Sequence, residues 1–299
     1  MDIRDYYRDK YKNEFKKFLD KDFNIGMLEP DPFVEVPYID YKNYVFAGTD
    51  NSKAWEKNIK EHRDKLEYYI DNPINYRFNK QWFRSDFDYK PEPDRKVDIY
   101  LGCSHTMGIG KHLEHTWVQR VGEHMGNDII NLGTGGHGID VSYIVLKKYI
   151  DYYNVQNVFH YQPIYSRHYI LDVDERHQSV SPAWSFNIDK YFTKEYQRET
   201  LMDWGYIMFT YARAIDAIES VCKERNIKYY FNQLENIKQV WMYFNTGREK
   251  MKKGDILARD LMHYSFYSNK EIADWFIDKS SKYDYFFSWK GAYDGHGGE

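Results

Sequence analysis

Ser104 has the surroundings of a catalytic nucleophile. It follows the apolar run 97–101 and lies between Gly102 on one side and Gly108 and Gly110 on the other. Because glycines tolerate backbone angles and close approaches that side chains forbid, the chain can turn sharply here before a helix. Ligands of open α/β sheets bind beyond the carboxyl ends of the strands, where this serine would lie. The alternative, commoner for an isolated Gly-x-Ser, is a glycine-rich connection with an inert serine.

A base and a residue to orient it come late in the chain, as Asp260 and His263. A serine hydroxyl is a weak nucleophile at neutral pH and needs a histidine base, which a carboxylate holds in the correct tautomer. The spacing lets one loop present the carboxylate to Nδ1 and leave Nε2 for the serine. Ser268 and Glu271 then have capping-box spacing, which predicts a helix that anchors this loop.

The segment 128–138 repeats the pattern of an apolar run followed by a glycine turn, and it leads into a helix-like stretch at 139–153. Backbone N–H groups at such a turn can stabilise the oxyanion of a tetrahedral intermediate. We expect the N–H groups of Ser104 and Gly133 to form an oxyanion hole.

In order and spacing, these segments resemble the blocks of the SGNH (GDSL-like) hydrolase family. Gly102-Cys-Ser104 stands where that family has Gly-Asp-Ser, Asn131-Leu-Gly133 matches its second block, and Asp260-x-x-His263 matches its last. The resemblance covers residues 95–280, and the ordered set is more specific than any one motif. It implies a serine esterase without a cofactor, in which a Ser104–His263–Asp260 triad forms an acyl-enzyme.

One block departs from the family. The family has a strand that ends in Gly-x-Asn-Asp, whose asparagine completes the oxyanion hole, whereas the segment 157–163 carries no such signature. Gln162 is the nearest side-chain amide and is the predicted substitute. The alternative is a hole with two donors, and the loss of one donor typically lowers the rate about a hundredfold or more.

The substrate class follows from the resemblance only broadly, as an acyl ester. Since the chain has no apolar lid stretch, we expect a short acyl group, such as an O-acetyl group on a carbohydrate. His105, Tyr161 and Tyr165 are the expected substrate contacts, and the irregular insertion 164–189 is the expected wall of the site.

A structural or binding protein with this fold and little or no activity is the rival hypothesis. The blocks also look similar to SGNH-like proteins of tailed bacteriophages, so a virion component is included. Its N-terminal region would then mediate self-association or bind a virion partner.

Composition excludes several other classes. The formal net charge of −4 over 299 residues gives no basic surface for nucleic acid. No stretch approaches the roughly 18 apolar residues of a membrane span. The start Met1-Asp-Ile-Arg lacks the pattern of a signal peptide. Cys103 and Cys222 cannot form a disulfide framework and suit a reducing cytoplasm at synthesis. If the chain is a phage protein, its later location is the virion.

Two further histidine patterns need interpretation. His112 and His115 have a spacing seen in metal sites, but no second ligand pair follows at a fixed distance, so we expect surface histidines and no metal. Asp294 and His296 are a competing acid–base pair, disfavoured because no helix anchors them.

The predicted core is a doubly wound, flavodoxin-like parallel sheet in a three-layer α/β/α arrangement. Apolar runs at 97–101, 128–132, 157–161 and 227–231 alternate with helical segments. The predicted helices cover 2–21, 54–70, 113–125, 139–153 and 193–223. The expected domains are a mainly helical N-terminal extension (1–94), the SGNH-like domain (95–282) and a tail (283–299).

Overall fold

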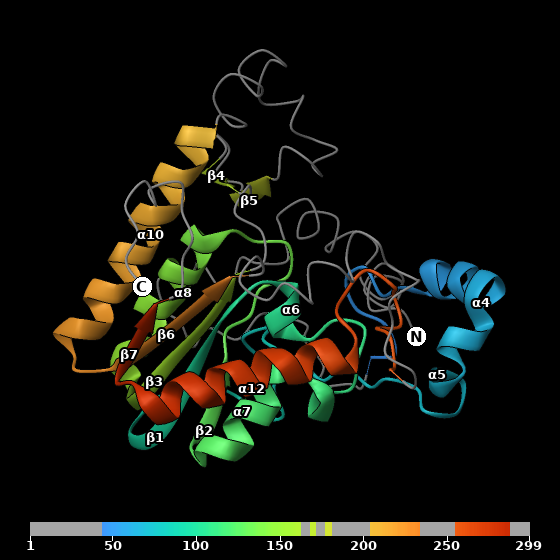
Figure 1. Ribbon diagram of the computed structural model, residues 1–299, viewed down its shortest axis with the longest axis horizontal. Helices are drawn as coiled ribbons and strands as arrows, with labels where there is room; N and C mark the ends of the chain where they lie inside the picture. The colour runs from blue at the N-terminus through green and yellow to red at the C-terminus, as the bar shows by residue number, and fades with distance from the viewer. Residues whose placement is uncertain (1–43, 163–167, 172–176, 181–203, 234–254, 288–299) are drawn as a thin grey trace.

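A computed structural model describes residues 44–162, 168–171, 177–180, 204–233 and 255–287 (Figure 1). The predicted helix at 2–21, Tyr165, the pair Asp294 and His296, and much of the insertion 164–189 lie outside these residues. Within the insertion, β4 (His168–Leu171) and β5 (His177–Val180) pair antiparallel.

The central sheet has five parallel strands in the order β2-β1-β3-β6-β7. They are β1 (Glu92–Gly102), β2 (Asp128–Asn131), β3 (Tyr153–Gln162), β6 (Lys228–Gln233) and β7 (Tyr285–Phe287). This order is that of flavodoxin-like doubly wound folds and confirms the predicted fold class. The edge strand β7 comes from the segment that the sequence assigned to a tail.

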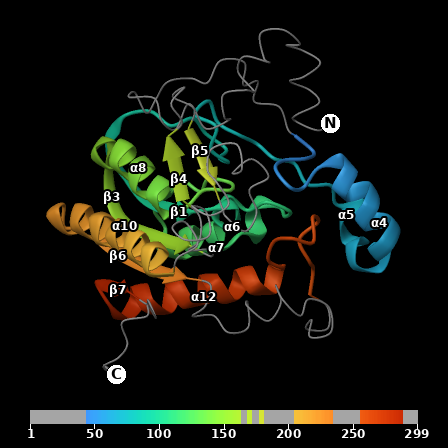
Figure 2. The ribbon, with the colours of Figure 1, turned by 90° about the horizontal axis from the view of Figure 1, so that it is seen from above.

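Helices cover both faces of the sheet. One face carries α8 (Ile139–Tyr149) and α10 (Trp204–Glu224), and the other carries α7 (Trp117–Met125) and α12 (Phe266–Lys282) (Figures 1 and 2). Successive residues of a strand point to opposite faces. Accordingly, Ile99 and Leu101 of β1 belong to the apolar cluster under α8 and α10, whereas Tyr100 belongs to the cluster under α7 and α12.

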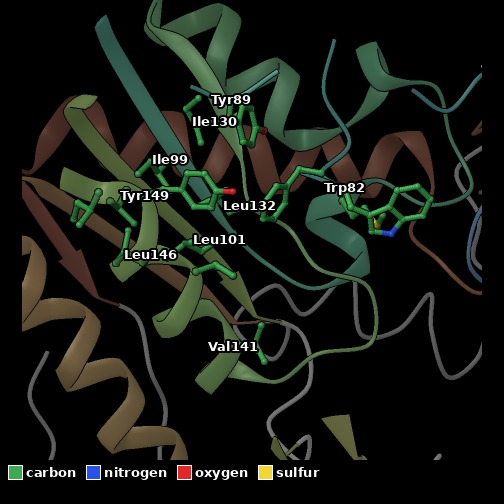
Figure 3. Close-up of a cluster of buried hydrophobic side chains, with 14 of the residues drawn as sticks. Trp82, Tyr89, Ile99, Leu101, Ile130, Leu132, Val141, Leu146 and Tyr149 are labelled. Carbon is green, nitrogen blue, oxygen red and sulfur yellow. The ribbon is translucent and has the colours of Figure 1, made fainter. Parts of the chain in front are cut away.

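The segment 44–89 packs into the same apolar cluster as the sheet. It contains α4 (Ser52–Leu66) and α5 (Tyr68–Asp71), which lie on the side of the molecule away from α10 (Figures 1 and 2). Tyr89 packs on Tyr149 of α8 and donates to the carbonyl of Asn131 in β2, and Trp82 belongs to the same buried cluster (Figure 3). The boundary expected at residue 94 falls inside β1.

Several helix ends differ from the sequence prediction for local reasons. The N-cap of α12 is Ser265, three residues before the predicted cap, and its side chain accepts from the N–H of Ser268. The stretch 113–125 divides into a 3₁₀ turn (Leu113–His115) and α7, since Thr116 caps the latter. Gly126 follows α7 in the left-handed conformation, so the helix ends at residue 125, as the sequence predicts.

Within the described residues, no helix is both long and apolar enough to cross a lipid bilayer.

Candidate active site

Ser104 lies at the start of α6 (Ser104–Met107), the short helix that follows β1. Between residues 101 and 110 every residue except Ser104 is buried. The hydroxyl of Ser104 lies 3.8 Å from the sulfur of Cys103. The turn therefore presents one hydroxyl at the carboxyl edge of the sheet, as the sequence predicts.

Glycine is required where the chain leaves β1. Gly102 has φ +144°, and a Cβ there would collide with the side chain of Thr106 and the carbonyl of Tyr161. Gly108 closes α6 in the left-handed region, with φ +82°. Both positions need a backbone that other residues rarely adopt, which explains the glycines around Ser104.

The loop before α12 holds Asp260 and His263 together. The Nδ1 atom of His263 lies 2.7 Å from Oδ2 of Asp260, and both side chains are almost fully buried. The other oxygen, Oδ1, accepts from the backbone N–H groups of Met262 and His263 at 3.1 and 3.2 Å. The carboxylate therefore fixes both the loop and the ring.

The charge state of Asp260 follows from these contacts. Burial alone would raise its pKa, but the charge and hydrogen bond of His263, with further hydrogen bonds from Thr49 and the Met262 N–H, hold the pKa well below its usual range. Since the carboxylate accepts, Nδ1 of His263 carries the proton of the neutral ring and Nε2 does not.

Backbone contacts hold this loop against the turn 102–110, which contains Ser104 and is called the nucleophile turn below. The N–H of Arg259 donates to the carbonyl of Gly110 at 2.7 Å. The ring of His263 lies 4.7 Å from that of His105, the residue next to Ser104, and His105 stacks on Tyr264 at 3.8 Å. In the described part of the chain, the Ser104 hydroxyl and His263 are not hydrogen-bonded. The contact between these two side chains therefore stays a prediction.

The three predicted oxyanion donors have different surroundings. The N–H of Ser104 is at the first position of α6, where helix N–H groups have no intrahelical acceptor. The N–H of Gly133 donates to Oδ1 of Asn131 at 2.9 Å. The amide of Gln162, 1% exposed, donates to the carbonyl of His137 at 3.4 Å. Two of the three donors thus have acceptors within the protein.

Gly133 also has a packing role. A Cβ at this position would come within 2.5 Å of the N atom of Met107 and 2.8 Å of the carbonyl carbon of Thr106. The side chain of Asn131 spans the same contact, since its amide donates to the Thr106 carbonyl at 3.1 Å. The segment after β2 therefore rests directly on α6.

The expected substrate contacts are mostly buried. His105 is 4% exposed, and Tyr161 is fully buried between Trp117 and Tyr264. Tyr161 is thus a core residue with no surface open to a substrate. Met262, which sequence reasoning did not single out, is 47% exposed beside His263.

Sequence reasoning also missed a buried cluster of charged side chains near Asp260. Arg259 makes an ion pair with Asp50, with both side chains at most 3% exposed, and the Asp50 carboxylate also accepts from the hydroxyl of Tyr76. Lys111 lies nearby, fully buried, and burial lowers its pKa to about 7 although Asp260 and Asp50 oppose this shift. Arg259 and Asp50 are 209 positions apart, so no local pattern announces the pair.

Metal ligands do not gather among the described residues, where no cluster of three or more His, Cys, Asp or Glu side chains could hold an ion. His112 stacks on Tyr69, and His115 packs on Phe266. Burial lowers the pKa of both histidines. The two histidines therefore serve in aromatic packing between α5 and the start of α12.

Comparison with known proteins returns structures but no sequence relatives. No protein-family model matches the chain, and no curated protein matches it. Among solved structures, the chain is similar to a member of the lipolytic protein G-D-S-L family from Veillonella parvula, with 11% identity over 63% of this chain and 100% of that one and a TM-score of 0.34.

Two further similar structures are esterases. One is an acetyl xylan esterase from the rumen bacterium Butyrivibrio proteoclasticus, with 12% identity over 64% of each chain and a TM-score of 0.36. The other is a carbohydrate esterase, with 11% identity over 64% of this chain and 70% of that one and a TM-score of 0.37. At identities this low, the similarity concerns the fold, and the substrates of these proteins are not assigned to this chain.

Proposed function

We propose that this protein is a serine esterase of the SGNH type, with Ser104 as nucleophile, His263 as base and Asp260 as the residue that orients it. The observation that carries the proposal is the buried hydrogen bond between Asp260 and His263. The ring of His263 lies against that of His105, the residue next to Ser104, and Ser104 is partly exposed. A paired acid and histidine beside an accessible serine is the arrangement that acyl transfer requires.

The reaction proceeds in two balanced halves. The Ser104 oxygen bonds to the ester carbonyl carbon while Nε2 of His263 takes the hydroxyl proton, and the C–O bond to the alcohol breaks as His263 returns that proton to the leaving oxygen. Water then attacks the acyl-enzyme, gives a proton to His263, and releases the acid as Ser104 is reprotonated. Asp260 remains ionised and stabilises the imidazolium in both halves.

The oxyanion of each intermediate binds the N–H of Ser104 first. Gly133 and Gln162 become second and third donors only if their N–H groups leave Asn131 and the His137 carbonyl when substrate binds. We propose a short acyl group on a carbohydrate as the substrate, because the sequence has no apolar stretch that could serve as a lid over a long acyl chain.

A binding protein with little turnover is the second candidate. The observation that favours it is the engagement of two predicted oxyanion donors within the protein. Because one missing donor typically lowers the rate about a hundredfold or more, such a site could bind an ester without hydrolysing it effectively.

Hydrolysis of p-nitrophenyl acetate, with a panel of acetylated sugars and longer-chain esters, tests the proposal. We expect the wild type to hydrolyse short acyl esters and Ser104→Ala to lose this activity. Ser220→Ala is the matched control, because Ser220 is an exposed serine of α10 that bonds only its own helix. Equal turnover by wild type and Ser104→Ala would exclude the proposal that this chain is an esterase with Ser104 as nucleophile. Binding of acetylated sugars without turnover would favour the second candidate.

A fluorophosphonate probe provides an independent measurement. An activated Ser104 is expected to be labelled in the wild type, and the label is expected to disappear in His263→Ala. Equal labelling of both proteins would mean that His263 does not activate this serine.

A further inference from the structure

Thr49 belongs to the N-terminal segment, yet its side chain reaches the acid of the proposed triad. Its hydroxyl donates to Oδ2 of Asp260 at 2.6 Å across 211 positions of sequence. The same oxygen accepts Nδ1 of His263 at 2.7 Å. Thr49 and His263 therefore share one acceptor atom, and the position of that atom determines where the imidazole points.

The backbone around Thr49 is fixed from two sides. Asp50, the next residue, is bound by the guanidinium of Arg259 through both carboxylate oxygens at 2.8 to 3.1 Å. Arg259 also donates to the carbonyl of Val45. On the other side, the side chain and backbone N–H groups of Asn51 donate to the Thr49 carbonyl, and Asn51 caps α4.

The same cluster holds the nucleophile turn. The hydroxyl of Tyr76 donates to Asp50 at 2.5 Å and accepts the N–H of Gly110 at 2.7 Å. Gly110 in turn accepts the N–H of Arg259. One continuous set of hydrogen bonds thus connects the turn after Ser104, the segment 44–51 and the loop of Asp260.

We propose that Thr49 is a positioning residue for Asp260 and His263, so that the segment 44–51 completes the active site. This inference rests on the proposed function and deepens it. With four hydrogen bonds, the Asp260 carboxylate has both oxygens engaged and cannot rotate. Without the Thr49 hydroxyl, Oδ2 keeps only the histidine as a partner. The carboxylate can then turn and its bond to Nδ1 weakens, so the ring can leave the orientation in which Nε2 would face Ser104.

A merely structural role for Thr49 makes a different prediction. Thr49 is exposed apart from this hydroxyl contact, so replacing it with valine leaves the core and the Asp50–Arg259 pair intact. If the hydroxyl only tied the segment down, its loss would lower thermal stability and leave kcat and the tautomer of His263 unchanged.

The experiment compares Thr49→Val and Thr49→Ser with the wild type. We expect Thr49→Val to lower kcat on p-nitrophenyl acetate by about tenfold or more with little change in KM, because small displacements of catalytic groups affect the chemical step. Thr49→Ser keeps the hydroxyl and is expected to restore kcat. Asn72→Ala is the matched control, since it removes an exposed side-chain hydrogen bond to the Tyr68 carbonyl elsewhere in the segment 44–89, touches neither Thr49 nor Asp260, and is expected to lower Tm but not kcat.

A second measurement needs no substrate. Two-bond ¹H–¹⁵N spectra of the imidazoles report which nitrogen of His263 is protonated, and His263→Gln assigns the signal. We expect the Nδ1–H tautomer in the wild type and in Thr49→Ser, and a mixture of tautomers in Thr49→Val.

The outcomes separate this inference from the proposed function. If the wild type hydrolyses no ester but Thr49→Val still changes the His263 signal, the positioning role stands and the esterase proposal fails. If Thr49→Val matches the wild type in both kcat and the His263 spectrum, the positioning role is overturned. An equal loss of kcat in Asn72→Ala would also overturn it, since general loosening of the segment 44–89 would then be the cause.

Discussion

Gly110 lies directly against Asp260. A Cβ at Gly110 would come within 2.9 Å of Oδ1 of Asp260 and within 2.9 Å of the Cβ of Ala258. Gly110 is the sixth residue after Ser104, so the turn that carries the proposed nucleophile has room for the acid of the proposed triad only because this position has no side chain.

Gly110→Ala is therefore expected to damage both stability and activity. Gly110 has φ +80°, and an alanine there adds about 1–2 kcal/mol of backbone strain to the cost of the contact with Asp260. Gly126→Ala isolates the strain, because Gly126 has φ +75° and a Cβ there would meet nothing within 4 Å. Urea unfolding should show a larger loss for Gly110→Ala, and only this variant should lose esterase activity. Equal losses in stability would show that the contact with Asp260 does not matter.

Gly133→Ala is expected to displace α6. Its Cβ would meet the backbone of Met107 and Thr106, which cannot give way without moving the helix that bears Ser104. Overpacking of this kind costs about 1–3 kcal/mol. Gly135→Ala is the control two residues away, since its Cβ would meet only the flexible sulfur of Met107 at 3.5 Å. Thermal melts and ester hydrolysis should separate the two, and similar behaviour would argue against a rigid contact at Gly133.

Asp50→Ala is expected to lower the free energy of unfolding by about 3–5 kcal/mol, because it leaves Arg259 buried without its carboxylate. Asp274→Ala removes an ion pair with Lys270 whose side chains are about half exposed, and it should cost only about 0–1 kcal/mol. Urea unfolding measures both. A loss for Asp50→Ala as small as that of the exposed pair would mean that water reaches Arg259.

Lys111→Met is expected to stabilise the protein at neutral pH, by an amount that falls as the pH rises. Burial lowers the pKa of Lys111 to about 7 in the folded chain, whereas an unfolded lysine titrates near about 10.4. Between these values the unfolded state binds more protons, so the stability of the wild type rises with pH. The variant lacks this dependence, and its advantage should be greatest below about pH 7 and shrink toward about pH 10.

Urea unfolding at several pH values measures this difference. The exposed lysine in Lys57→Met serves as the control, and its stability difference from the wild type should not depend on pH in this way. A constant advantage of Lys111→Met from about pH 6 to about pH 10 would contradict the lowered pKa.

The sequence predicts the sheet well because its central strands, β1 and β3, end in runs that are buried on both faces. Four apolar runs separated by helical segments indicate parallel strands, and all four are strands of the central sheet. The fifth strand, β7, is three residues long and is set by its pairing with Tyr229, Tyr230 and Phe231. So short an edge strand has no periodicity of its own.

Local chemistry predicts the Asp260–His263 pair but not its support. Two side chains three residues apart can be paired from sequence, whereas the contact of Thr49 with Asp260 is fixed by tertiary packing. The capping error at α12 has a similar origin: Ser265 and Ser268 are both residues that can cap a helix, and Ser268 is itself buried in the first turn. The role of Gln162 stays a prediction, as does the contact between Ser104 and His263.

The joint core of the sheet and the segment 44–89 has a consequence for how the molecule melts. Phe83 and Tyr89 pack on Tyr149 of α8, and Tyr89 also donates to the Asn131 carbonyl of β2, so neither part retains a closed interior when the other is removed. Calorimetry should record one endotherm rather than two. A chain shortened to begin after residue 89 would expose an apolar surface and would be prone to aggregation.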